Sequence, residues 1–165
     1  MAEFLRITVT GNDGLQRFLT DAVRQLQRPS DLMEALAARL EANINERFDR
    51  KVDPTGAAWA PLAPATLERY AALDQGRRQG TLLERTGQMR ASLTSAAGDD
   101  FAEVGMSRLT DGGEWSIPLL HETGTRRMPR RGIFLADPDA GTLGQQDEAM
   151  LTEEIQAFLD DVFGG

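Results

Sequence analysis

Apolar residues recur at helical spacing through the first third of the chain. Between residues 15 and 27 they stand three or four positions apart, as on one face of an amphipathic helix. From residue 32 to residue 48 an apolar side chain occupies every fourth position, which predicts a second helix ending near Arg50. Ser30 comes just before this stripe and is a typical N-cap residue. The pattern therefore predicts two successive helices.

Later segments carry shorter patterns that indicate strands. Apolar and polar residues alternate over residues 5–10, which predicts a strand before a glycine-rich turn. We expect further strands at residues 101–106 and 133–136, and a strand or a short helix at residues 115–120.

Three more helices are predicted. Pro64–Leu73 is expected to form a short helix, and Thr86 is placed to cap a helix that runs through Leu93. A stripe over residues 150–162 marks a C-terminal helix whose apolar side is expected to pack on the body. Asp53-Pro54-Thr55-Gly56 has the composition of a type I turn.

Helices around a small antiparallel sheet define an α+β fold class. We expect one domain over residues 1–165, in which the sheet is flanked by the two N-terminal helices and the C-terminal helix. Residues 51–81 and 123–147 are expected to contain extended, mobile loop arms.

The composition is typical of a globular domain. The chain has 165 residues, 41% hydrophobic and 27% charged, and no apolar run is long enough to span a bilayer. The first residues lack the basic start and apolar block of a signal peptide, so none is expected. Cysteine is absent and His121 is the only histidine, which excludes disulfides, thiolate sites and a zinc site built on several histidines.

The charge is unevenly distributed along the chain. The formal net charge is −8, and the 34 residues after Arg131 contain eight acids and no base. The part up to Arg131 is formally neutral. An acidic surface repels the phosphates of nucleic acids, so the charge argues against a general DNA-binding protein.

Four arginines within residues 126–131 form the strongest basic cluster. They can form a solvated loop, bind phosphate, or pair with the acidic C-terminal helix of a neighbouring copy. Glycines bracket the segment and a proline stiffens it, which favours an extended arm over a helix. Met128, Ile133 and Phe134 argue for a subunit contact, because a purely solvated loop has little use for apolar side chains.

Candidate chemistry is sparse. His121 and Glu122 are an adjacent acid–base pair, and Ser116 is a possible nucleophile beside His121. Adjacent residues point in different directions, so a structural role for the pair is the stronger interpretation. Several aspartates carry carboxylates suited to metals but stand in turn-forming sequences: Asp53, the pair Asp99 and Asp100, and Asp137 with Asp139. There is no phosphate-binding glycine loop, and we expect no enzyme activity, cofactor or metal site.

Four segments occur in an order that resembles a known family. The resemblance covers residues 30–163 and rests on the whole ordered set. The segments are Phe48 with Asp53-Pro54-x-Gly56-x-x-Trp59-x-x-Leu62-x-x-x-Thr66; Leu82-Leu83-x-x-Thr86-Gly87-x-Met89-x-x-Ser92-Leu93; Val104-Gly105 with Leu120-His121-Glu122-x-Gly124-Thr125; and Met128-Pro129-x-Arg131-x-x-Phe134-Leu135. Together they resemble the phage virion morphogenesis family of Mu-like and related tailed phages, also called tail completion proteins, and the wider group of small neck and tail-joining proteins.

The resemblance implies a structural virion protein of the neck or tail, made in the bacterial cytoplasm and without catalysis. It implies tail completion, tail termination or head–tail joining by a closed ring of copies, a hexamer or a multiple of one. The other partners implied are neighbouring neck or tail proteins, with DNA only as passing cargo and no membrane. Two alternatives are an assembly factor that leaves before maturity and a small hydrolase that uses His121.

The ring hypothesis assigns roles to two sets of residues. Acids of the C-terminal helix are expected to face the lumen, where they would let DNA slide without sticking. Trp59 is expected either at a subunit interface or in the core. The expected interface residues are Trp59, Arg126, Arg127, Met128, Arg130, Arg131 and Phe134, and the expected lumen-facing acids are Glu153, Glu154, Asp160 and Asp161.

Overall fold

Helices surround a two-stranded antiparallel sheet in the computed structural model, which describes residues 13–27, 29–73 and 82–163. This confirms the α+β fold class and the helices predicted in the first half of the chain. The elements are α1 (Asp13–Gln27), α2 (Ser30–Arg50), α3 (Pro64–Leu73), α4 (Gln88–Ala91), β1 (Leu93–Ala97), β2 (Ala102–Met106), α5 (Ile117–Thr123) and α6 (Gln145–Phe163).

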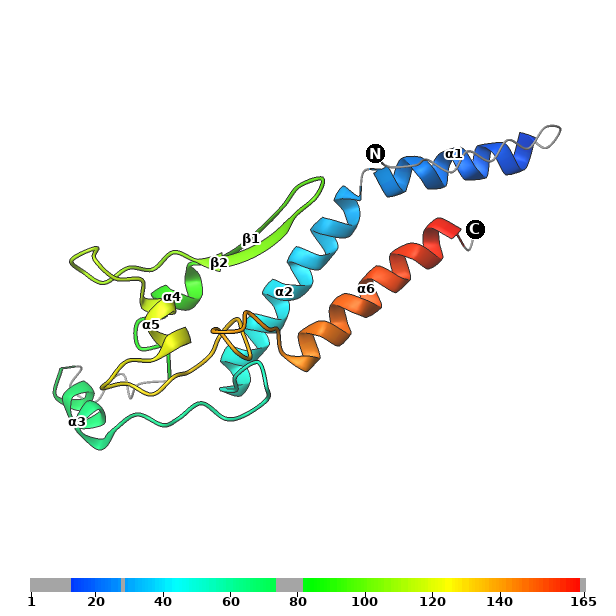
Figure 1. Cartoon of the computed structure of the whole chain (residues 1–165). Coiled ribbons are helices and arrows are strands. Elements are labelled where there is room, and N and C mark those ends of the chain that lie inside the picture. Colours follow the sequence, from blue (N-terminus) through cyan, green and yellow to red (C-terminus); the bar gives the residue numbers. More distant parts are fainter. Residues whose placement is uncertain (1–12, 28, 74–81, 164–165) are drawn as a thin grey trace.

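Helix α2 is the central element of the fold. Figure 1 shows α6 running beside it in the opposite direction, with the β1–β2 hairpin on the other side of α2. The four-residue stripe of α2 faces these neighbours, so Leu32, Leu36, Ile44 and Phe48 are buried. Burial of such a stripe is what stabilises a helix of this kind in water.

A buried ion pair fixes α6 against α2. Arg47 of α2 and Asp147 in the first turn of α6 are both buried, and their side chains form a salt bridge. Asn43 donates to the other carboxylate oxygen of Asp147 at 3.0 Å, and Arg47 donates to the carbonyl oxygen of Ile133 at 2.9 Å. These additional hydrogen bonds offset part of the cost of removing both charges from water.

The core lies where α2, α4 and β1 meet two long loop segments. The rings of Phe48 and Trp59 pack edge to face, with centroids 5.3 Å apart and an interplanar angle of 76°. The indole N–H of Trp59 donates to the carbonyl oxygen of Gly132 at 2.9 Å. Of the two environments expected for Trp59, the structure therefore shows the core. The buried cluster comprises Ile44, Phe48, Trp59, Met89, Leu93 and Ile133.

The apolar stripe of α6 is only partly covered by the body. Val162 is buried, Leu151 and Phe158 are half-buried, and Ile155 is exposed. The expected packing of the C-terminal helix on the body is confirmed through its contact with α2. The helix begins at Gln145, five residues before the predicted stripe.

The helix predicted from Thr86 through Leu93 is wrong in its second half. Helix α4 ends at Ala91, and Leu93 begins β1, a strand that the sequence pattern did not predict. The hydroxyl of Ser92 donates to the carbonyl oxygen of Met89 at 2.7 Å as the helix ends. Leu93 then pairs with Met106 on the strand predicted at residues 101–106. A partner strand therefore decides the local conformation here.

Other predictions need correction or lie outside the described part. Residues 133–136 form no strand: the N–H groups of residues 133–135 bond to a side chain, and that of Ala136 bonds to the carbonyl oxygen of Thr142 in a turn. Ser30 is the first residue of α2, and Pro29 takes the cap position without a side-chain hydrogen bond. Of the two conformations expected for residues 115–120, the structure shows the short helix, α5, which begins at Ile117. The strand predicted at residues 5–10 lies outside the described residues.

Candidate functional site

The carboxylate of Glu122, on α5, organises the segment that follows the helix. It is buried and accepts backbone hydrogen bonds from Ile133 at 2.6 Å, Phe134 at 3.0 Å and Leu135 at 3.0 Å. Arg130 donates to the carbonyl oxygen of Glu122 at 2.8 Å. The structural role favoured for Glu122 is therefore confirmed. Its partners lie eight to thirteen residues away, so no local pattern identifies them.

The side chain of Arg131 forms its hydrogen bonds within its own chain. It is buried, and its guanidinium donates to the carbonyl oxygens of Ala60 at 2.7 Å and Pro61 at 3.0 Å. Burial lowers the pKa of this guanidinium below its usual value. Its hydrogen bonds hold the segment after Trp59 against the segment after α5. Arg131 is therefore not available to a phosphate or to a neighbouring copy.

Arg126 and Arg127 differ from Arg131 because they stand at the tip of an exposed turn. Thr125 and Met128 close this turn through paired backbone hydrogen bonds of 2.9 and 3.3 Å. The two arginine side chains are exposed and make no hydrogen bond or ion pair with the described residues. The basic cluster of the sequence thus divides into two internal and two external arginines. We call residues 125–128 the basic turn.

Gly124 allows the basic turn to begin directly after α5. Its φ is +72°, a conformation that side-chain-bearing residues rarely adopt. A Cβ at this position would lie 2.9 Å from the backbone nitrogen of Arg130. Glycine therefore permits the chain to change direction after α5 and allows the backbone of Arg130 to pass close to Gly124.

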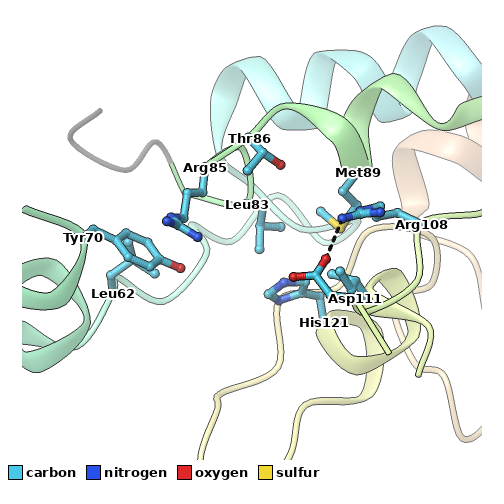
Figure 2. Close-up of a pocket in the computed structure, with 10 residues that line it drawn as sticks. Leu62, Tyr70, Leu83, Arg85, Thr86, Met89, Arg108, Asp111 and His121 are labelled. Atoms are coloured by element: carbon cyan, nitrogen blue, oxygen red, sulfur yellow. Dashed lines mark hydrogen bonds and ion pairs between the residues drawn. The ribbon is translucent and has the colours of Figure 1, made fainter. Parts of the chain in front are cut away.

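A cavity of about 280 Å³ lies between α3, α4 and α5. Figure 2 shows Tyr70 and Arg85 on one side and His121 with Asp111 on the other. The guanidinium of Arg85 lies over the Tyr70 ring, 4.7 Å from its centroid, and Arg108 pairs with Asp111 at 3.2 Å. The lining residues are Leu62, Tyr70, Leu83, Arg85, Thr86, Met89, Arg108, Asp111, Ile117 and His121.

Most residues of this cavity were not identified from the sequence. They come from distant segments, and nothing in the sequence shows that these segments meet. Leu83 adopts a positive φ of 63°, which is unusual for a residue with a branched side chain and has no signal in the sequence.

His121 lies in the cavity as a neutral imidazole. Burial first, and the positive charge of Arg131 second, lower its pKa from 6.5 to about 4. Its Nδ1 atom is buried and has no hydrogen-bond partner among the described residues. Ser116 instead caps α5, accepting a hydrogen bond from the Leu119 nitrogen at 3.4 Å. The structure thus does not place Ser116 and His121 in a hydrogen-bonded pair.

The proposed lumen acids of α6 have different surroundings. Glu154 pairs with Arg39 of α2 at 3.0 Å, and Asp160 accepts a hydrogen bond from Gln156 at 2.8 Å. Glu153 and Asp161 are exposed and have no cationic partner in the part of the chain that the structure describes. The helix ends without a basic residue in its last turn.

Asp53 and Asp137, two of the aspartates considered as metal ligands, stabilise turns. The Asp53 carboxylate accepts from the backbone of Thr55 at 2.8 Å and of Ala57 at 3.1 Å, while Asp137 accepts from Asp139 at 2.9 Å. This confirms the turn interpretation of both residues. Over residues 13–27, 29–73 and 82–163 no group of three or more acidic or histidine side chains is arranged to hold a metal ion.

Comparison with known proteins gives a family match over most of the chain. The model of the phage virion morphogenesis family matches residues 11–159. The chain belongs to the phage virion morphogenesis family. The described part of this family member contains no helix long and apolar enough to cross a membrane. No curated protein and no solved structure was found to match it.

Proposed function

We propose that the chain is a structural protein of the phage neck or tail, which assembles head to tail into a closed ring around the DNA passage. It would complete or terminate the tail, or join it to the head, and would carry out no catalytic step. Membership in the phage virion morphogenesis family supports a role in virion formation. The finer role is supported by the separation of charge within the chain.

This separation of charge is the observation that carries the proposal. The basic turn follows α5, and Figure 1 shows α5 far from the C-terminal end of the acidic helix α6. Arg126 and Arg127 have no acidic partner within the described residues, and Asp161, in the last turn of α6, has no basic one. Two different patches at opposite ends of one subunit suit a head-to-tail contact, which closes into a ring when the rotation permits.

The interface proposed here is smaller than the one expected from the sequence. Arg130 and Arg131 are bonded within the chain, Trp59 is in the core, and half-buried Phe134 packs against that core. Arg126 and Arg127, together with half-buried Met128, remain in the proposed contact. Exposed ion pairs contribute about 0–1 kcal/mol each, so the arginines would mainly select the partner and its register.

Purified virions test this proposal. A ring subunit remains in finished particles at a fixed copy number, which quantitative mass spectrometry of the virion measures. The second candidate, an assembly factor, occurs in precursors and is missing from finished particles. Absence from the virion would therefore overturn the ring proposal. Full heads beside free tails in a null mutant would indicate joining, whereas tails of uncontrolled length would indicate termination.

Glu153 is the acid that best suits a lumen wall. It is exposed and not engaged by another described residue, whereas Glu154 is held by Arg39. A negative wall repels DNA and lets it pass without binding. Glu153→Lys, present in every copy of the ring, is expected to slow DNA delivery while particles still form. Normal infectivity of this variant would contradict the lumen assignment.

A further inference from the structure

The outer edge of strand β2 is open. Within the described residues β2 pairs only with β1, so the sheet has two strands. Gly98 donates to the carbonyl oxygen of Phe101 at 2.9 Å, which makes these residues a hydrogen-bonded pair. Because such pairs alternate along an antiparallel ladder, Ala102, Val104 and Met106 direct their backbone N–H and C=O groups away from β1. This edge can therefore accept a third strand.

A largely apolar hollow of about 250 Å³ lies between β2 and α5, and we call it the β2 hollow. Val104 and Met106 line it from β2, and Pro118 and Leu119 line it from α5. Leu119 is 59% exposed, so an apolar side chain of this lining faces solvent. An open strand edge with apolar pockets beside it is typical of sites that bind an extended segment by strand addition.

Strand β2 lacks the features that usually protect the edge of a sheet. It contains no proline and no lysine, and Glu103 is its one charged residue. An edge of this kind pairs readily with a further strand. The addition would also stabilise the sheet, because two strands alone are marginally stable in water.

Residues 5–10 have the pattern of a strand that fits this edge. The sequence predicts a strand there, and the segment lies outside the described residues. One side of this predicted strand carries Leu5, Ile7 and Val9, and polar residues alternate with them. Added to β2, the apolar side would continue the face of Val104 and would be directed toward the β2 hollow.

The polar side of the predicted strand suits the other face of β2. Arg6 belongs to this polar side together with Thr8 and Thr10. It would share a face of the sheet with Glu103, which is exposed. Opposite charges on neighbouring strands attract each other. Both sides of the predicted strand therefore match the face of β2 that they would extend.

The predicted strand cannot reach the β2 hollow of its own copy. Figure 1 shows α1 running away from the hairpin, with Asp13 at the far end of the helix. The 15 residues of α1 give it a length of about 22 Å. Six residues lead from Ile7 to Asp13, and they span at most about 20 Å. That length leads back no further than the α2 end of α1, whereas the β2 hollow lies beyond it, at the α5 end of the hairpin (Figure 1).

We propose that residues 5–10 of one copy add to the open edge of β2 in a neighbouring copy as a third strand, with Leu5, Ile7 and Val9 directed toward the β2 hollow. The inference rests on the proposed assembly of copies and names a contact that the separation of charge does not supply. The contact is heterologous, because the strand and the edge are different patches of the chain. Backbone hydrogen bonds would provide affinity, and the apolar side would set the register.

Engineered disulfides test this contact directly, because the chain has no cysteine of its own. Full-length Ile7→Cys is mixed with full-length Val104→Cys under mild oxidation, and mass spectrometry identifies the linked peptides. In this mixture only a contact between copies can join the two positions. We expect a disulfide between positions 7 and 104, because paired residues on one face of a sheet have Cβ atoms about 4.5–5.5 Å apart. Glu103→Cys, the matched control, should link far less, because side chains that point to opposite faces cannot be bridged.

A pair of lysine variants tests which side of the strand is buried. Ile7→Lys is expected to lower the yield of rings at least about tenfold, because burial of an isoleucine side chain contributes that much or more to association. Thr8→Lys should assemble like the parent chain, since its side chain would lie on the solvent side with Glu103. Native mass spectrometry of the full-length proteins measures both yields. A difference between adjacent positions is the mark of a strand with one buried side.

A probe on the receiving surface identifies the occupant. Benzoyl-phenylalanine replaces Leu119, and irradiation is carried out on particles formed in infected cells. Crosslinks to residues 5–10 of another copy are expected. Crosslinks to a different virion protein, and not to residues 5–10, would overturn the proposed strand addition.

The possible results separate this inference from the proposed function. No disulfide between positions 7 and 104, equal linking in the Glu103→Cys control, or equal yields of the two lysine variants overturns the strand addition. A disulfide that forms only within single chains carrying both cysteines overturns the neighbouring copy as its source. A ring seen by native mass spectrometry and a fixed copy number in virions would still support the proposed function. Absence of the protein from virions overturns that function, whereas the disulfide in purified protein still supports the strand addition.

Discussion

Single side chains in this protein replace contacts that secondary structure usually makes. The buried carboxylate of Glu122 accepts three successive backbone hydrogen bonds from residues 133–135, which have no strand partner. Buried backbone N–H groups require such acceptors, because an unpaired one costs about 1–3 kcal/mol. Glu122 therefore determines the path of the chain between α5 and α6.

Glu122→Gln is expected to lower the free energy of unfolding by about 2–3 kcal/mol, since hydrogen bonds to a charged group contribute about 1.5–3 kcal/mol. The amide also turns one acceptor oxygen into a donor that faces backbone N–H groups. Urea unfolding followed by circular dichroism measures the change. Glu103→Gln on β2 is the control, because Glu103 is exposed, and it should change stability little. Equal stability of the two variants would contradict the role of Glu122.

The buried imidazole of His121 predicts a pH dependence of stability. The unfolded histidine gains its proton near pH 6.5, whereas the folded one gains it only near pH 4, because its pKa is lowered to about 4. The unfolded state therefore binds more protons between these values, so stability falls as the pH drops through this window. Above pH 6.5 His121 is neutral in both the folded and the unfolded state, so its contribution to stability does not change with pH.

Replacement of His121 isolates this contribution. The unfolding free energies of the parent chain and His121→Gln are compared by urea unfolding at several pH values between 4 and 7.5. We expect the parent to lose stability relative to the variant on acidification below pH 6.5 and to parallel it above. Parallel curves over the whole range would show that His121 titrates normally in the folded protein.

At the scale of elements, α2 and α6 are held together by charge as well as by apolar packing. The pair Arg47–Asp147 lies at the end where the C-terminal residues of α2 meet the first turn of α6. Asn43 and the carbonyl oxygen of Ile133 complete the hydrogen bonding. The pair therefore sets how α6 is placed along α2 and against the segment that contains Ile133.

Asp147→Ala is expected to lower the free energy of unfolding by about 3–5 kcal/mol, because it leaves the buried charge of Arg47 without its partner. Thermal or urea unfolding measures this loss. Glu148→Ala, next to it in the same turn but exposed, is the matched control. A loss of similar size in both variants would indicate an effect on helix formation instead of the buried pair.

At the scale of the whole molecule, the two pairs of arginines near α5 have different structural roles. Arg130 and Arg131 hold loop segments to the body, while Arg126 and Arg127 extend away from it on the basic turn. The chain thus combines an internally fixed body with a positive patch and, on α6, a negative one. Stability and assembly are therefore expected to respond to different mutations.

The double variant Arg126→Ser and Arg127→Ser is expected to unfold within about 1 kcal/mol of the parent, since exposed charges contribute little to folding. The same variant should fail to build rings or to complete particles. Differential scanning calorimetry and native mass spectrometry measure the two properties. Arg131→Ser, the contrasting variant, should lose stability because it leaves the carbonyl oxygens of Ala60 and Pro61 without donors. Normal assembly with weakened DNA binding in the double variant would favour a nucleic-acid role for the turn.

Local periodicity was enough to predict the long helices of this protein. The apolar stripes of α2 and α6 identify their helices because helical hydrogen bonds join residues four apart. Turns at Asp53 and Asp137 are equally local, since each carboxylate bonds to nitrogens two to four residues later. The ordered motifs of the sequence also indicated the family.

Contacts between distant segments were decided only by the tertiary structure. The strand β1, the extended path of residues 133–135 and the separation of the four arginines depend on partners far along the chain or outside any periodic element. The cavity collects side chains from α3, α4, α5 and the loops between them. Burial of Trp59 and Glu122 follows from the same long-range packing, because a side chain loses its water only when remote parts of the chain close over it.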